Sequence, residues 1–189
     1  MSVRMSREHE LPHGVRAARD ASIERDPVAA EARGREMLDA TGAAIIAGVE
    51  RTVPSWVAAQ VSRIAGAWGR LDPQARRALD DAVPGAGRAA TQRVVERLKP
   101  LLRTDPEAQA STPLEIVRTV YREPTALLER AGIPPVVRDD FDERAWPDDV
   151  YGLVPRTLGD LGDDELAPLQ LAWGVAKATV LRARRAQPT

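Results

Sequence analysis

The chain has 189 residues, of which 43% are hydrophobic and 29% are charged, a composition typical of a folded globular domain. Its formal net charge of −1 gives no global electrostatic reason to expect nucleic acid or an anionic membrane as partner. The absence of cysteine excludes disulfides and thiol nucleophiles, and no apolar run reaches the roughly 20 residues that a membrane-spanning helix needs. We therefore expect a cytoplasmic protein without a membrane partner.

Residues 1–25 combine mixed charge with the breakers Pro12 and Gly14, so we expect a flexible tail. Its two histidines, His9 and His13, are four residues apart, a spacing that can place two metal ligands on one helical face. Pro12 lies between them and argues against that helix. No metal site or other cofactor is predicted.

The pair Asp26-Pro27 combines an N-cap with a first-turn proline and predicts a helix to about Val53. The stretch from Ala43 to Leu71 carries apolar residues at steps of three and four and is the predicted centre of the core. Pro54 interrupts it, which predicts either two helices in nearly the same phase or one kinked helix. The expected core face of the first helix comprises Met37, Leu38, Ile45 and Val49.

Two more Asp-Pro pairs mark later helix starts. Asp72-Pro73 predicts a helix that ends at the breakers of residues 83–87, after which another helix follows with a bend near Pro100. Asp105-Pro106 predicts a start that continues for about one turn only.

The strongest local signal is Thr112-Pro113-Leu114-Glu115, which combines a capping box with proline at the first helical position. We expect the helix that begins there to divide at Pro124 and to end at Gly132. A last helix is predicted from the acidic residues 163–165 to the arginines at 182–185, whose positive charge suits a helix C-terminus.

Residues 133–165 contain repeated Pro and Gly and are predicted to form short helices and ordered loop. Between residues 139 and 165 ten acidic residues outnumber two basic ones, which gives a net charge of −8. Such a cluster is typical of a solvated surface with helix caps, of a docking surface or of a cation site, although the spacing does not match an EF-hand loop. The candidate interaction surface comprises Asp139, Asp140, Phe141, Trp146, Asp148, Asp149 and Tyr151.

A second candidate site is a ligand pocket near the aromatic residues Trp146, Tyr151 and Trp173 and the amine of Lys177. The competing interpretation is that the tryptophans pack in the core and that Lys177 lays its aliphatic stem along the core edge. With both histidines in the tail, no Ser–His relay has a base. The sequence therefore favours a non-enzymatic role and leaves an enzyme open.

Basic residues concentrate between Arg63 and Arg103, where nine bases and four acids give +5. This region can pair with the acidic segment of the same chain or of a second copy, or it can contact phosphates. Residues 127–133 also look like the first helix and turn of a helix-turn-helix motif. The acidic residues that follow Pro134-Pro135 would repel phosphates, so nucleic acid is not the expected partner.

Several short segments of the C-terminal half form a recognisable set. They are Thr112-Pro113-Leu114, Pro124-Thr125, residues 131–135, Arg138-Asp139, Phe141, Arg144-Ala145, residues 147–151, Trp173-Gly174 and residues 176–178. Through them, and less clearly around Val53-Pro54, the chain resembles a group of uncharacterised helical proteins from high-GC Gram-positive (actinobacterial) bacteria. The resemblance implies a single domain in a bacterial cytoplasm and assigns no catalytic or cofactor-binding residue.

Together these signals predict an all-α, single-domain bundle of five to seven helices over residues 26–185, with tails at 1–25 and 186–189 and a loop-rich acidic segment before the last helix. The leading hypothesis is a non-enzymatic interaction or regulatory protein whose partner is another protein or a second copy of the chain. The alternative is a helical protein, including an enzyme, that binds a small molecule or a metal. A nucleic-acid binder is the third hypothesis.

Overall fold

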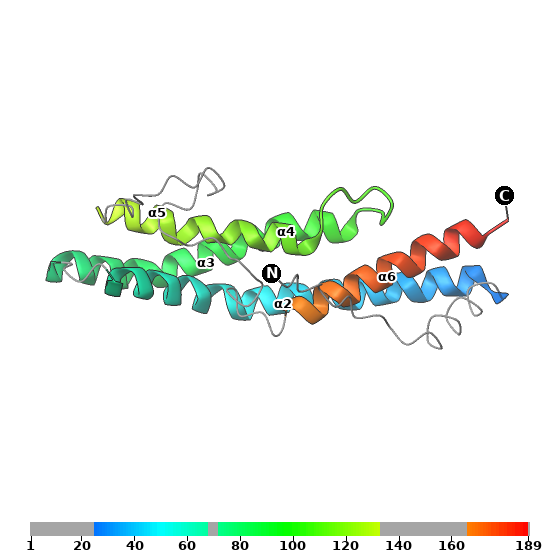
Figure 1. Ribbon diagram of the computed structural model, residues 1–189, viewed down its shortest axis with the longest axis horizontal. Helices are drawn as coiled ribbons and strands as arrows, with labels where there is room; N and C mark the ends of the chain where they lie inside the picture. The colour runs from blue at the N-terminus through cyan, green and yellow to red at the C-terminus, as the bar shows by residue number, and fades with distance from the viewer. Residues whose placement is uncertain (1–24, 68–71, 133–165, 189) are drawn as a thin grey trace, which may run out of the picture.

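The computed structural model describes residues 25–67, 72–132 and 166–188, and all regular structure in these ranges is helical. The elements are α2 (Pro27–Ala67), α3 (Pro73–Arg103), α4 (Pro113–Val117), the 3₁₀-helix η1 (Arg118–Tyr121), α5 (Arg122–Arg130) and α6 (Leu166–Ala186). Because α4, η1 and α5 follow each other without a gap, they form one interrupted rod, and the described ranges contain four such rods (Figure 1). The predicted all-α class is confirmed for this part of the chain.

Helix α2 begins where the sequence predicts and continues much further. The side chain of Asp26 caps it by accepting a hydrogen bond from the backbone N–H of Ala29 (3.0 Å). The helix then runs for 41 residues with Pro54 inside it, so of the two predicted alternatives the structure has a single helix, and the predicted end near Val53 is wrong. Val53 and Val57, on either side of Pro54, are both buried in the same core, and this shared packing holds one helix together across the proline.

Helix α3 contradicts the predicted break at residues 83–87, because it runs from its N-cap Asp72 to Arg103 with Pro84 and Pro100 inside it. The reason is tertiary packing. Gly87 is buried against α2, where a Cβ atom would lie 3.1 Å from the Cα of Pro54. A residue that reads as a local breaker therefore allows two helices to approach closely.

The next rod starts at the predicted capping box. The hydroxyl of Thr112 accepts a hydrogen bond from the N–H of Glu115 (3.4 Å), and the Glu115 carboxylate accepts one from the N–H of Thr112 (2.8 Å). The predicted division at Pro124 lies one turn too late, because the change to 3₁₀ geometry occurs at residues 118–121 and Pro124 falls in the first turn of α5. As predicted, the helix ends at Gly132, which has a positive φ of 70°.

The rods pack on different halves of α2. Helix α6 lies antiparallel to the N-terminal half, since Gly34 faces Val180, Gly42 faces Trp173 and Gly48 faces Leu166. Helix α3 returns along the C-terminal half, and the α4–α5 rod covers α3 and α2 there (Figure 1). The start of α4 also reaches α6, because the amide oxygen of Gln170 accepts a hydrogen bond from the N–H of Leu114 (3.2 Å).

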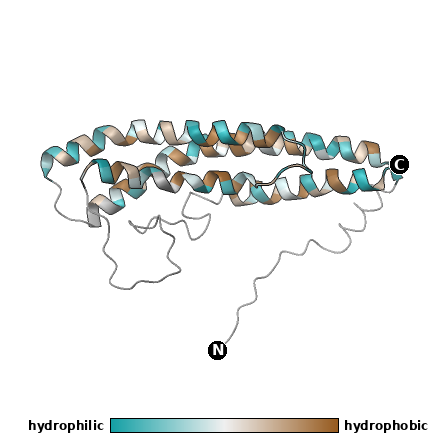
Figure 2. Ribbon diagram, turned by 90° about the horizontal axis from the view of Figure 1, so that it is seen from above, coloured by the Kyte–Doolittle hydropathy of each residue, from teal (hydrophilic) through white to brown (hydrophobic). Residues whose placement is uncertain are grey.

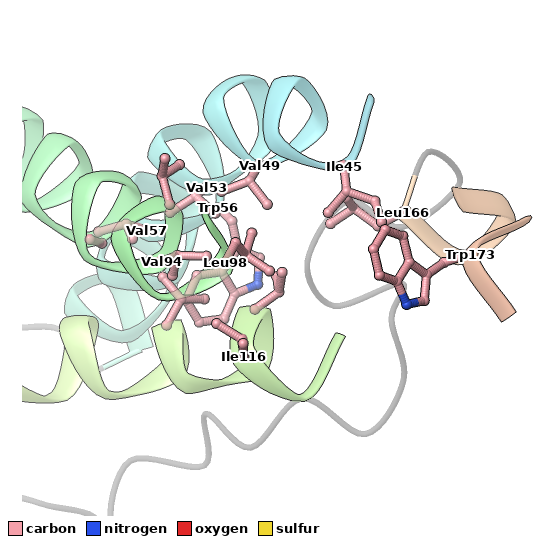
Figure 3. Packing of buried hydrophobic residues seen from close by; sticks show 14 of the residues in the cluster. Ile45, Val49, Val53, Trp56, Val57, Val94, Leu98, Ile116, Leu166 and Trp173 are labelled. Carbon is pink, nitrogen blue, oxygen red and sulfur yellow. The ribbon is translucent and has the colours of Figure 1, made fainter. Parts of the chain in front are cut away.

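One hydrophobic cluster connects both halves, with Ile45, Leu166 and Trp173 at one end and Trp56, Leu98 and their neighbours at the other (Figure 3). Hydrophilic residues alternate with hydrophobic ones along the long helices, as expected for rods with one buried side (Figure 2). Leu38, Ile45 and Val49 are buried as predicted. Met37 is 40% exposed, so its predicted core position is wrong. The core face of α2 passes through Leu38 instead.

Candidate functional site

The whole predicted interaction surface, from Asp139 to Tyr151, lies outside the described residues, as do two members of the predicted pocket, Trp146 and Tyr151. The structure does describe the two helices between which this part of the chain lies in the sequence, α5 and α6. Before it, α5 packs through the fully buried Leu128. After it, α6 begins at the buried Leu166, which lies against Gly48.

The two described pocket residues, Trp173 and Lys177, are one turn apart on α6. Trp173 is only 2% exposed and packs with Ile45 and Leu166, so its ring is part of the core (Figure 3). Lys177 is half-buried, and its Nζ donates a hydrogen bond to the backbone carbonyl of Gln109 (3.4 Å). Both side chains thus have structural partners, while the predicted pocket itself remains a prediction.

A shallow groove of about 470 Å³ does open elsewhere, between the start of α3 and the end of α5. Its wall is mainly alanine and leucine, with polar side chains at its edges. The lining residues are Asp72, Gln74, Ala75, Ala78, Leu79, Ala82, Leu127, Arg130 and Ala131. This is an apolar recess of ligand size.

Two arginines of the basic region bind neighbours on the α4–α5 rod. Arg93 forms an ion pair with Glu123 of α5, and the guanidinium of Arg97 donates a hydrogen bond to the hydroxyl of Thr119 (3.0 Å). These contacts hold the rod against α3. This part of the basic region thus has a packing role.

A network of charged side chains joins the far end of the α2·α6 hairpin to the turn after α3. Arg184 of α6 donates from Nε to Glu31 of α2 (2.9 Å) and from Nη1 to Asp105 (2.7 Å), and its Nη2 contacts the second oxygen of Asp105. Arg35 and Gln187 also donate to Glu31, at 2.9 Å each. We call these five residues the hairpin clamp.

Contacts within the clamp shift the pKa values of three of its side chains. Hydrogen bonds from Arg184, helped by those from Arg35 and Gln187, lower the pKa of Glu31 below its ordinary 4.5. The same guanidinium, together with the N–H of Glu107, holds the pKa of Asp105 well below its ordinary 3.8. In return the two carboxylates raise the pKa of Arg184. Glu31, Asp105 and Arg184 are therefore all charged near neutral pH.

Sequence reasoning did not find the clamp. The pair Glu31 and Arg35 has the i,i+4 spacing of a helical ion pair, which was the one local signal. Arg184 is 153 residues from Glu31, and its place in the sequence indicates only an interaction with the C-terminal dipole of its helix. Nothing in the local sequence connects these positions.

Two kinds of feature are absent from the described residues. Within residues 25–67, 72–132 and 166–188, no group of three or more His, Asp or Glu side chains could hold a metal ion. None of the helices in those ranges has the length and apolar character required to cross a bilayer.

Comparison of the chain with family models, with curated protein sequences and with solved structures gave no significant match. The resemblance to actinobacterial helical proteins therefore remains a prediction.

Proposed function

We propose that this protein is a non-enzymatic interaction or regulatory protein of the cytoplasm that captures a protein partner through its acidic segment, residues 139–165. The observation that carries the proposal is the charge of −8 in a segment that is bounded on both sides by packed helices. Leu128 anchors the preceding helix and Leu166 the following one. Anchored ends limit the conformational freedom that a docking segment loses when it binds.

The recognition chemistry follows from the composition of the segment. Clustered carboxylates steer a basic partner and set its orientation, and Phe141, Trp146 and Tyr151 supply apolar anchors among them. The expected partner is therefore a protein with a basic surface that also accepts aromatic side chains. We include the predicted total of five to seven helices in this proposal, with the additional helices in residues 133–165.

The test is a charge reversal with a matched control. Native mass spectrometry of the protein purified from its own cells first identifies the bound polypeptide. The double variant Asp148→Lys/Asp149→Lys should then lose that polypeptide. The control Asp80→Lys/Asp81→Lys makes the same charge change at an adjacent, exposed acidic pair on α3 and should retain it. Equal recovery by all three proteins would rule the proposal out.

A second candidate function is binding of a small apolar ligand, and the groove of about 470 Å³ between α3 and α5 favours it. The measurement is a thermal-shift screen of metals and metabolites, because a ligand that binds only the folded state raises its melting temperature. Ala78→Trp, at an exposed wall position, should remove any such shift. A screen without a stabilising compound would count against this function.

A further inference from the structure

The half of the α2·α6 hairpin that lies at the start of α6 is free of charge on both helices. On α2 no charged residue occurs from Ala40 to Val49, and on α6 none occurs from Leu166 to Ala176. The contacts of Gly42 with Trp173 and of Gly48 with Leu166 place these two runs side by side. We call this part of the hairpin the charge-free belt.

One face of the belt is already covered. A Cβ atom added at Gly42 would lie 3.3 Å from the side chain of Leu102, at the end of α3. On α6, Gln170 and Lys177 bind Leu114 and Gln109, which belong to α4 and the turn before it. The end of α3 and the start of α4 therefore cover the same side of the hairpin.

The opposite face has an apolar stripe on each helix. On α2, Met37, Ala40, Ala44 and Ala47 are spaced by three and four residues and lie on the side away from α3. On α6, Pro168, Leu171, Ala172 and Val175 lie on the side away from Gln170 and Lys177. Leu171 is 65% exposed, although the helix around it carries no charge. A helix that is apolar on all sides is normally buried on all sides.

The dimensions of this face suit a pair of identical chains. The two helices lie side by side from Ala30 to Gly48, which gives a face roughly 27 Å long and roughly 20 Å wide. That corresponds to roughly 540 Å² per copy and roughly 1,100 Å² for a pair, just above the roughly 1,000 Å² that a specific interface should bury. The face also has the anatomy of an interface, because the apolar stripe from Met37 to Ala47 has the charged residues Arg33 before it and Arg51 after it.

The chemistry of the face favours a second copy over a different protein. In a two-fold pair the same patch of both copies is in contact, so a charge on the axis would face the identical charge of the other copy and be repelled. The two apolar stripes of this face carry none. We propose that two copies of this chain pair through the charge-free belt, so that α2 and α6 of each copy form a four-helix arrangement. This inference is independent of the acidic segment and its partner.

The test is the mass of the purified full chain as a function of concentration, by sedimentation velocity or light scattering. The wild type should be a dimer at micromolar concentrations. Leu171→Glu and Ala40→Glu, one on each stripe and both at exposed positions, should raise the dimer dissociation constant at least about 100-fold because each places a charge in a desolvated centre. Circular dichroism should show unchanged helix content.

The matched control is Val28→Glu. Val28 is 67% exposed, which is close to the 65% of Leu171, but it lies at the end of the hairpin outside the belt. This variant should remain a dimer. A wild type that is monomeric at every concentration would overturn the proposal, and so would Leu171→Glu and Val28→Glu dimers of equal stability.

Discussion

Along its N-terminal half, α2 contacts α6 through small residues, whereas along its C-terminal half it contacts α3 and the α4–α5 rod mainly through large ones. Three glycines, Gly34, Gly42 and Gly48, lie at the α6 contact, and the clamp around Arg184 closes its far end. The other half buries Val53, Trp56 and Val57 of α2 beneath α3 and α4, and Figure 3 shows them beside Leu98.

The difference between the two halves predicts opposite sensitivities. Where helices touch through glycine, there is little side-chain volume to remove, and an added atom pushes the helices apart. Where they touch through large aliphatic and aromatic groups, the greater loss comes from removing atoms and leaving a cavity. The N-terminal half of α2 should therefore be destabilised mainly by larger residues and the C-terminal half mainly by smaller ones.

The largest expected effect comes from deleting volume in the C-terminal half. Leu98 is fully buried, so Leu98→Ala should lower the free energy of unfolding by about 4 kcal/mol, through lost transfer energy and a residual cavity. Urea denaturation measures this loss. Val28→Ala, a truncation at a position that is 67% exposed and lies outside the charge-free belt, is the control and should cost less than about 0.5 kcal/mol. Similar losses for the two variants would contradict the packing of α3.

A smaller effect is expected from adding volume in the N-terminal half. At Gly34 a Cβ atom would lie 2.8 Å from a methyl group of Val180 and 3.1 Å from its backbone nitrogen, so α6 itself would have to move. Gly34→Leu should therefore cost about 3 kcal/mol.

Gly174 is the matched control for Gly34, since a Cβ atom there would meet nothing within 4 Å. Gly174→Leu should be neutral or stabilising by up to about 1 kcal/mol, because leucine favours a helix more than glycine does. If the two leucine variants unfold at the same urea concentration, the close contact between α2 and α6 is wrong.

Much of the helical pattern could be predicted from the sequence, because the signals act within one turn. The capping box at Thr112, the N-caps Asp26 and Asp72, and the end at Gly132 all depend on hydrogen bonds or backbone angles of nearby residues. Such features appear in the structure as the sequence indicates.

The errors arise where distant packing overrides a local signal. Residues 83–87 read as a break, yet Gly87 serves the contact with Pro54 and α3 continues. The pairing of α6 with α2 and the Arg184–Glu31 contact join residues far apart in the chain, which no periodicity in a single sequence encodes. The predicted interaction surface remains a prediction, because the residues from Asp139 to Tyr151 lie outside the described part of the chain.

The smallest expected effect concerns the clamp at the end of the small-residue half. Arg184→Met keeps the aliphatic stem and removes the guanidinium, which should lower Tm by about 2–4 °C near neutral pH, because a partly exposed ion-pair network contributes little. Arg185→Met, at the exposed neighbouring position outside the clamp, should change Tm by less than about 1 °C.

The pH dependence of this difference identifies its cause. The folded protein holds the pKa values of Glu31 and Asp105 below their ordinary values of 4.5 and 3.8, so the stabilisation by the clamp is present above those values. It is lost as the pH falls through the lower, folded values and the carboxylates take up protons. The Tm difference between wild type and Arg184→Met should therefore be constant from pH 7 to about pH 5 and shrink below about pH 4. A difference that does not change with pH would mean that Arg184 stabilises the hairpin by the packing of its stem and not by its charge.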